Sequence, residues 1–183
     1  MDGTTDITRT YPLGPLTEDE KRFYTWTLQS HIDLARAVWL DYCECKMIDT
    51  IAREPLWRHL INYRCGTGHS VSFVGNVHEG PHALNSRNTT RMRPGMVVTD
   101  EPGVYETDLV GIRIENELVC VHKADNQYGT FLGFEPLMFV PIATSPILPG
   151  VLDKDEIAWL NDYHRQVFAK LAPHLNDLSL IHI

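Results

Sequence analysis

Acidic side chains stand inside apolar, strand-like stretches at three places in this chain. Asp6 lies in DGTTDITRT, Glu101 in TDEPGVY and Glu115 in GIRIENELV, while His69 lies among small residues in GTGHSV. Burying a charge on an apolar strand is costly unless the charge is paired or bound to a metal ion. The fold of this chain is therefore expected to bring these four segments together.

One imidazole and three carboxylates form a suitable ligand set for a divalent cation. Carboxylate oxygens suit Mn, Mg or Ca, and a single imidazole widens the choice toward Mn, Fe, Co or Zn. Because a metal-bound water loses its proton near neutral pH, the set also predicts water activation. Each residue alone has a simpler explanation: Asp6 could cap a turn, Glu115 could be an exposed strand residue, and His69 could be a hydrogen-bonded core histidine. The joint pattern favours a shared ion.

Two capping signals predict the starts of long helices. Thr17 followed by Glu20 is a capping box that opens a helix expected to reach about Trp39. The acidic run 153–156 opens another helix, which Pro173 stops. The expected inward faces are Tyr24, Leu28, Ile32, Ala35 and Trp39 in the first helix and Ile157, Leu160, His164, Val167 and Leu171 in the last.

The segments between these helices predict a shorter helix and several strands. Residues 46–60 are expected to be helical, with Pro55 breaking the helix into two pieces. A turn is expected at Pro102-Gly103. The expected strand segments are 6–12, 96–98, 112–114, 118–120 and 134–140. Helices, then strands, then a helix predict an α+β domain whose antiparallel sheet is covered on one side by helices.

Composition limits the classes of partner. The 183 residues amount to one domain or a piece of a larger one, and the net charge of −8 disfavours non-specific nucleic-acid binding. No apolar run approaches the roughly 20 residues of a membrane span. The residues after Met1 predict no signal peptide, so neither a membrane nor a nucleic acid is an expected partner.

The cysteines are expected to be free thiols. Four cysteines in 183 residues do not form a dense disulfide framework, which favours reduced thiols in a cytoplasmic protein. A structural zinc is the weaker alternative, because the spacing of its candidate ligands is not the usual Cys-x2-Cys. Those candidates are Cys43, Cys45, His59 and Cys65.

An ordered set of motifs resembles one protein family. The chain carries DGTTDITRT, GTGHS, NVHEGP, RPGMVVTDEPGVYE, GIRIENELV, FEPLMFVPI and WLNDYH, in this order. The set resembles the C-terminal part of the catalytic domain of eukaryotic-type Xaa-Pro aminopeptidases (aminopeptidase P), which belong to the pita-bread metallopeptidases. The resemblance implies that residues 1–150 form roughly the second half of a pita-bread catalytic domain. Residues 151–183 would be a helical extension of the same domain.

The resemblance implies roles for the metal-ligand candidates. Asp6 would bridge two metal ions, His69 and Glu101 would bind the first ion, and Glu115 would bridge both and take part in catalysis. The family has a further aspartate ligand eleven positions before the one that matches Asp6, which would precede Met1. One ion is therefore expected in this chain, where the family has two. Manganese is the expected metal, with cobalt or zinc as alternatives.

Three further residues would serve the substrate or support the ligands. His78 in VHEGP would contact the substrate or shuttle a proton. Arg113 would support the carboxylates through charge-assisted hydrogen bonds. Cys65 stands where the family has a histidine that helps to position the substrate.

Two functions remain open at this point. The resemblance implies a metal-dependent aminopeptidase that releases the N-terminal residue from peptides with proline second, through a metal-activated hydroxide. This chain alone is then expected to have little or no activity. The alternative is a non-catalytic pita-bread fragment that acts in binding or self-association. Both readings predict a homo-oligomer, because half of such a domain would leave apolar surface uncovered.

Overall fold

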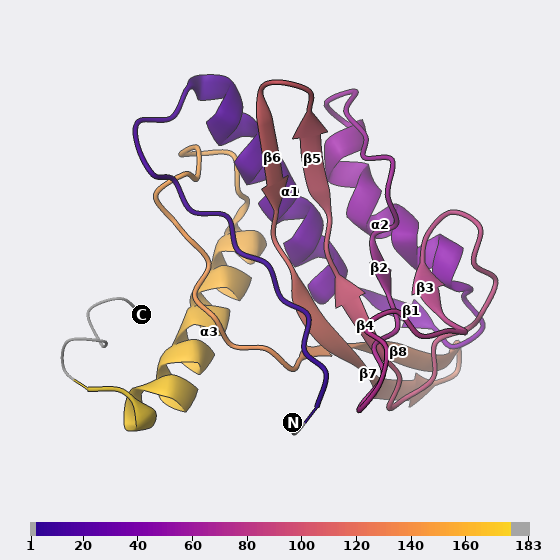
Figure 1. Ribbon diagram of the computed structural model, residues 1–183. Coiled ribbons are helices and arrows are strands. Elements are labelled where there is room, and N and C mark those ends of the chain that lie inside the picture. The colour runs from indigo at the N-terminus through magenta and orange to yellow at the C-terminus, as the bar shows by residue number, and fades with distance from the viewer. Residues whose placement is uncertain (1–2, 177–183) are drawn as a thin grey trace.

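The computed structural model describes residues 3–176. Its central sheet has the strand order β1-β8-β7-β4, with antiparallel neighbours, and two ribbons pair β2 with β3 and β5 with β6. The elements are α1 (Glu18–Ala35), β1 (Val38–Leu40), α2 (Cys45–Trp57), β2 (Gly68–His69), β3 (Ala83–Leu84), β4 (Val97–Asp100), β5 (Gly103–Glu106), β6 (Val110–Arg113), β7 (Asn116–Asn126), β8 (Gly129–Pro136), α3 (Lys154–Leu171) and a short 3-10 helix, η1 (Ala172–His174). Figure 1 shows α1 and α2 behind the strands and residues 3–12 running along the front.

The first helix begins as predicted and ends earlier. Thr17 is its N-cap, and the Thr17 and Glu20 side chains form the reciprocal capping box. The prediction that the helix reaches Trp39 is wrong. The helix ends at Ala35, and Trp39 lies in β1, paired with Leu132 of β8. An aromatic residue between Val and Leu favours a strand once an open sheet edge is available.

Helix α2 is continuous, so the prediction that Pro55 breaks it is also wrong. Pro55 lies inside α2, which ends two residues later at Trp57. Proline removes one backbone hydrogen bond and crowds the preceding turn. Because Pro55 lies so close to the end of α2, these effects do not interrupt the helix.

Helix α3 buries a different face from the predicted one. Its N-cap Asp153 forms a capping box with Glu156, as the sequence indicates. Leu160 and Val167 are buried as predicted, but Ile157 is 45% exposed. Glu156 and Tyr163 are buried in its place. The burial of the Glu156 carboxylate is compensated by hydrogen bonds from the Gln29 side chain at 3.0 and 3.1 Å.

Two strand predictions need correction. Residues 6–12 are extended but form no strand, since their contacts with the sheet are single hydrogen bonds such as Glu115 N to the Thr8 carbonyl at 3.0 Å. The strand expected over 134–140 is β8, which starts earlier and ends at Pro136. Proline cannot donate to a strand ladder, which accounts for the early end. The predicted strands at 96–98, 112–114 and 118–120 correspond to β4, β6 and β7.

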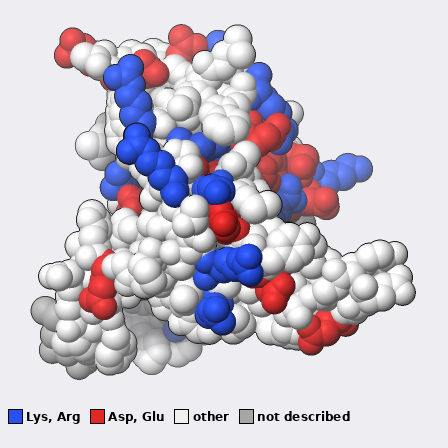
Figure 2. Space-filling model, turned by 90° about the vertical axis from the view of Figure 1, so that its right-hand side faces the viewer, with Lys and Arg blue, Asp and Glu red and all other residues white. Residues whose placement is uncertain are grey.

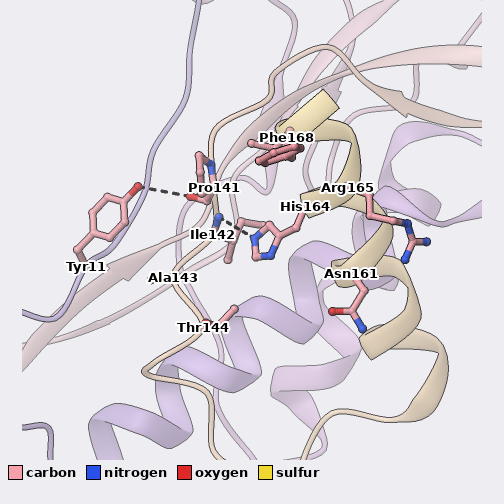
Figure 3. A pocket seen from close by; sticks show the side chains of 10 residues that line it. Tyr11, Pro141, Ile142, Ala143, Thr144, Asn161, His164, Arg165 and Phe168 are labelled. Atoms are coloured by element: carbon pink, nitrogen blue, oxygen red, sulfur yellow. Dashed lines mark hydrogen bonds between the residues drawn. The ribbon is translucent and has the colours of Figure 1, made fainter. Parts of the chain in front are cut away.

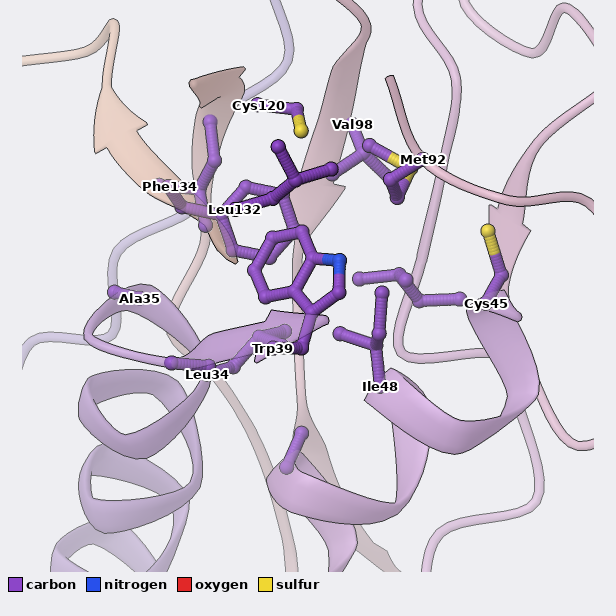
Figure 4. Close-up of a cluster of buried hydrophobic side chains, with 14 residues drawn as sticks. Leu34, Ala35, Trp39, Cys45, Ile48, Met92, Val98, Cys120, Leu132 and Phe134 are labelled. Atoms are coloured by element: carbon purple, nitrogen blue, oxygen red, sulfur yellow. The ribbon is translucent and has the colours of Figure 1, made fainter. Parts of the chain in front are cut away.

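Two apolar cores hold the helices against the sheet. Trp39 lies at the centre of the first core, where side chains of α2 meet those of β4, β7 and β8 (Figure 4). The second core joins α1 and α3 to β6 through residues such as Leu28, Leu160 and Ile112. The arrangement is α+β, with helices against one side of antiparallel strands, which confirms the predicted fold class. No helix among residues 3–176 is long and apolar enough to cross a membrane.

Candidate metal centre

Three of the four predicted ligands meet at the end of β4. The His69 Nε2 atom lies 3.1 Å from Glu101 Oε1 and 3.5 Å from Asp6 Oδ2. His69 ends the short strand β2, Glu101 directly follows β4, and Asp6 comes from the extended segment along the front of the sheet. Segments that are far apart in the sequence therefore supply neighbouring ligand atoms.

Threonine 99 fixes the relative position of His69 and Glu101. Its hydroxyl accepts a hydrogen bond from the His69 backbone N–H at 2.9 Å and donates one to Glu101 Oε1 at 2.9 Å. The Glu101 N–H donates to the Thr67 carbonyl at 2.8 Å. Gly68 is required for this approach, because a Cβ at that position would lie 1.7 Å from the Thr99 carbonyl oxygen.

Glu115 is the least satisfied acid of the group. It is 1% exposed, and its Oε2 accepts a short hydrogen bond from the Thr8 hydroxyl. Its Oε1 is buried and has no hydrogen-bond partner in the described part of the chain. Burial, together with the neighbouring charges of Glu101 and Asp6, raises the pKa of Glu115 to about 7. A buried oxygen without a donor is the kind of acceptor that a cation can satisfy.

The carboxylates and His69 pair with one another in this structure. Within residues 3–176, no group of three or more His, Cys, Asp or Glu side chains has the convergent arrangement of a formed metal site. Burial alone would lower the pKa of His69, but hydrogen bonds with Glu101 and the Ser70 carbonyl, together with the charges of Glu101 and Asp6, outweigh burial and raise the pKa. Burial alone would raise the pKa of Glu101, and hydrogen bonds from His69 and Thr99 together with the Arg113 charge lower it instead.

Arg113 supports the acids from the end of β6. Its Nη1 lies 3.2 Å from Glu101 Oε2, and its Nε donates a 2.8 Å hydrogen bond to the Tyr105 hydroxyl. Tyr105 lies on β5, the partner strand of β6, so the ribbon orients the guanidinium toward Glu101. The arrangement is a charge-assisted contact of the kind that fixes a ligand carboxylate.

A cavity of about 520 Å³ opens beside these residues. The His78 ring lies against the His69 ring, with 3.9 Å between centroids. The exposed Cys65 also faces this cavity. The lining includes Cys65, His69, His78, Glu101 and Arg113, which are five of the seven predicted site residues.

Sequence reasoning missed the buried polar residues that hold the ligands in place. Glu117, which is 4% exposed, accepts a 2.6 Å hydrogen bond from the Asp6 backbone N–H. His31 of α1 lies 3.0 Å from Asp100, and both side chains are fully buried. A histidine inside an apolar helix face was the available signal for this pair. Glu117 lies two positions after Glu115 and therefore points to the same side of its strand.

A larger cavity lies elsewhere, and its lining contains none of the predicted site residues. It measures about 890 Å³ and lies between residues 141–144 and helix α3. Figure 3 shows His164 accepting a hydrogen bond from the Ile142 N–H, at 3.1 Å, and Tyr11 reaching the Pro141 carbonyl from the other side. Burial lowers the pKa of His164. The chemistry-bearing residues of the chain gather at the smaller cavity.

The cysteines follow the free-thiol prediction. All four are unpaired in the structure. Among residues 3–176, no zinc-like cluster is formed by Cys43, Cys45, His59 and Cys65. His59 instead stacks on Trp26, with ring centroids 4.0 Å apart.

Known proteins resemble this chain over nearly its whole length. Residues 1–122 match metallopeptidase family M24, and residues 130–181 match the C-terminal region of peptidase M24. Aminopeptidase P1 of Lotus japonicus is 42% identical over 184 residues, which cover 98% of this chain and 28% of that protein. Aminopeptidase P2 of Arabidopsis thaliana is 44% identical over 181 residues, covering 96% of this chain and 25% of that protein.

A solved structure has the same arrangement of helices and strands. The X-prolyl aminopeptidase from Caenorhabditis elegans, described as a cytosolic enzyme with a di-nuclear active site, matches with a TM-score of 0.89 and 39% identity. The match covers 95% of this chain and 29% of that chain. The chain thus spans little more than a quarter of the length of these relatives and has the pita-bread fold over part of a domain.

Proposed function

The chain belongs to metallopeptidase family M24, and from that premise we propose that it provides the ligand face of a metal-dependent aminopeptidase. The substrate would be a peptide with proline in second position, from which the N-terminal residue is released. The observation that carries the proposal is Glu115 Oε1, which is buried beside the Asp6, His69 and Glu101 cluster and has no hydrogen-bond partner among residues 3–176. A purely structural acid would be expected to have its oxygens paired.

The proposed ligands are Asp6, His69, Glu101 and Glu115. Three carboxylates and one imidazole suit Mn, with Co or Zn as alternatives. A bound divalent ion would polarise the scissile carbonyl and supply a hydroxide near neutral pH. Four ligands in one chain make one ion the expected content, where the Caenorhabditis elegans enzyme is described as di-nuclear.

The surrounding residues would handle the substrate. The negative carboxylates would attract the free amine of the peptide, since opposite charges at short range favour each other. His78, whose ring meets the His69 ring edge to face, would contact the substrate or move a proton at the leaving amine. Arg113 would hold Glu101 in place through their 3.2 Å contact. Cys65 would offer a thiol at the cavity wall, which is a weaker hydrogen-bonding group than an imidazole.

A second candidate is a binding role without catalysis. Large apolar side chains are exposed in the described part of the chain, including Phe73 at 79%, Val74 at 64% and Leu13 at 101%. Exposed apolar surface of this kind favours association with another chain. A homo-oligomer in the cytoplasm is therefore part of either proposal. Turnover is what separates the two functions.

The deciding experiment combines metal content with cleavage. The chain is loaded with Mn or Co, desalted, analysed for metal and then assayed on an Xaa-Pro peptide. The proposal expects about one ion per chain and a low rate of cleavage, as expected of this chain alone, which Glu115→Gln abolishes. Glu106→Gln, at an exposed position on β5, is the matched control and is expected to retain both. Cleavage that survives Glu115→Gln would overturn the proposed ligand set, and self-association without turnover under any metal would favour the binding role.

A further inference from the structure

A second cavity, lined by arginines, adjoins the cavity of the candidate metal centre. It measures about 690 Å³ and shares Cys65, Gly66 and Asn85 with the cavity of the candidate metal centre, so the two cavities adjoin at these residues. We propose that this arginine cavity binds a carboxylate in the downstream part of a peptide whose N-terminus lies at the candidate metal centre. The inference rests on the proposed function and adds a substrate class, peptides with downstream acidic groups.

The charge of the arginine cavity opposes that of the whole chain. Its lining contains Arg53, Arg64 and Arg87 against a single acid, Asp49. The chain as a whole has a net charge of −8. Figure 2 shows the face of the molecule on the right-hand side of Figure 1, where Lys and Arg side chains lie interspersed with Asp and Glu side chains. A local excess of positive charge inside a hollow attracts anionic ligands.

Two of these arginines have no partner within residues 3–176. The side chains of Arg64 and Arg87 are exposed and form no hydrogen bond or ion pair. Four other surface arginines pair with nearby acids: Arg22 with Asp19, Arg36 with Asp33, Arg58 with Glu54 and Arg165 with Asp162. Within residues 3–176, the exposed Arg91 and Arg93 have no ion pair, but neither lines the arginine cavity. Arg64 and Arg87 therefore keep their full donor capacity for a ligand.

Buried groups fix the backbone that carries both arginines. Arg53 donates to the carbonyls of Tyr63 at 2.9 Å and Cys65 at 2.8 Å, on either side of Arg64. Arg87 lies in a turn closed by Asn85, whose side-chain oxygen accepts the Arg87 N–H at 3.0 Å. Less freedom of the backbone is then lost when a ligand binds. The Arg53 guanidinium also donates from Nε to Asp49 at 2.8 Å, so neither Arg53 nor Asp49 is expected to bind the ligand.

The opposite charges of the two adjoining cavities favour one direction for a bound peptide. A free amine is favoured near Asp6, Glu101 and Glu115 and disfavoured near Arg64 and Arg87. A C-terminal or side-chain carboxylate has the opposite preference and can accept paired N–H donors from a guanidinium. The peptide would therefore run from the candidate metal centre, past Cys65, into the arginine cavity.

The test is a comparison of two peptides by titration calorimetry on the metal-stripped chain. The peptides are Ala-Pro-Ala-Glu with a free C-terminus and Ala-Pro-Ala-Gln with a C-terminal amide, which differ in charge and little in shape. The acidic peptide is expected to bind about tenfold more tightly, the size of one good charge-assisted contact. In R64Q/R87Q this preference is expected to disappear, and in R64E/R87E to reverse. The preference should also shrink as salt is added.

Arg93→Glu is the charge-matched control. Arg93 is exposed and does not line the arginine cavity, so this variant should keep the full preference. Circular dichroism of each variant checks that it folds. Equal affinity for the two peptides, or a preference that survives R64Q/R87Q, would overturn the inference.

This design tests the proposed aminopeptidase function and the proposed carboxylate binding separately. Binding to the metal-stripped chain needs no turnover, so a clear carboxylate preference together with absent Mn-dependent cleavage would reject only the aminopeptidase. Mn-dependent cleavage together with equal affinities for the two peptides would reject only the proposed carboxylate binding in the arginine cavity.

Discussion

Two polar clusters with buried carboxylates contact the segment 62–69, and they differ in whether each carboxylate oxygen has a hydrogen-bond donor. On the α2 side, Asp49 accepts from Arg53 Nε at 2.8 Å and from the Thr67 hydroxyl, so both of its oxygens have donors. At the candidate metal centre, Glu115 keeps one buried oxygen without a donor. Both sites are buried, yet only the first is complete by itself.

This difference separates a structural pair from a site that awaits a ligand. Buried polar groups in folded proteins are nearly always paired, and exceptions concentrate at functional sites. The Asp49 cluster has one acid and one arginine, while the candidate metal centre combines Asp6, Glu101 and Glu115 with His69 and Arg113. We therefore expect the first cluster to govern stability and the second to govern the response to metal and pH.

Breaking the complete cluster should have the largest effect. Arg53→Met leaves Asp49 buried without its cation and removes the hydrogen bonds to the 63 and 65 carbonyls. The expected loss in the free energy of unfolding is about 3–5 kcal/mol. Urea unfolding of the metal-free chain measures it.

Arg58→Met is the control for this change. Arg58 lies one turn further along and pairs with Glu54 on the surface, where such pairs contribute about 0–1 kcal/mol. Equal losses in the two variants would show that the buried pair has no special role in stability.

Metal should act on the incomplete cluster alone. Adding Mn near neutral pH at about a hundred times its dissociation constant should stabilise the chain by about 2.7 kcal/mol, because only the folded state presents the ligand set. The measurement is the melting temperature with and without Mn. Glu115→Gln is expected to remove most of this gain, while Glu106→Gln keeps it. A melting temperature that Mn leaves unchanged in the parent chain would argue that the four ligands do not converge.

The same comparison shows what the sequence could and could not predict. Local signals located the capping boxes at Thr17 and Asp153, and the ordered motifs led to the family and the fold. The buried partners were not predictable, because they depend on contacts between distant segments. Glu156 is buried in α3 only because Gln29 of α1 meets it, which turns the helix away from the apolar face that its own period suggests. From the sequence, Asp49 and Arg53 look like an ordinary surface ion pair on a helix. In the structure, segment 62–67 covers them.

The pH response should sharpen the contrast between the clusters. Burial raises the pKa of Glu115 to about 7 and that of Asp100 to about 6, while hydrogen bonding raises the pKa of His69 against the effect of burial. For each group the folded state binds its proton more tightly than the unfolded state. Stability is then complete below the unfolded values and is lost as pH rises through the folded ones. The metal-free chain should lose on the order of 2 kcal/mol between about pH 5 and pH 8.

Urea titrations at the two pH values test this expectation. Glu115→Gln removes one titrating group, so its loss over the same interval should be smaller. Glu101 does not disturb the interval, because its lowered pKa places its titration below it. Stability of the metal-free parent chain that rises toward pH 8 would contradict the assignment of buried, proton-binding acids to this cluster.

The smallest expected effect isolates the one donor that Glu115 has. Thr8→Val removes the hydroxyl that donates to Glu115 Oε2 while keeping the shape of the side chain. At about pH 8 the ionised carboxylate loses its donor, at a cost of about 1 kcal/mol. At about pH 5 the carboxyl is protonated and depends less on a donor, so the cost should shrink. Thr10→Val is the matched control, because the Thr10 hydroxyl bonds only the Arg113 backbone and its loss should cost the same at both pH values. If Thr8→Val were equally costly at both, Glu115 would not be the group that titrates in this interval, and the pH response of the chain would come from Asp100 and His69 instead.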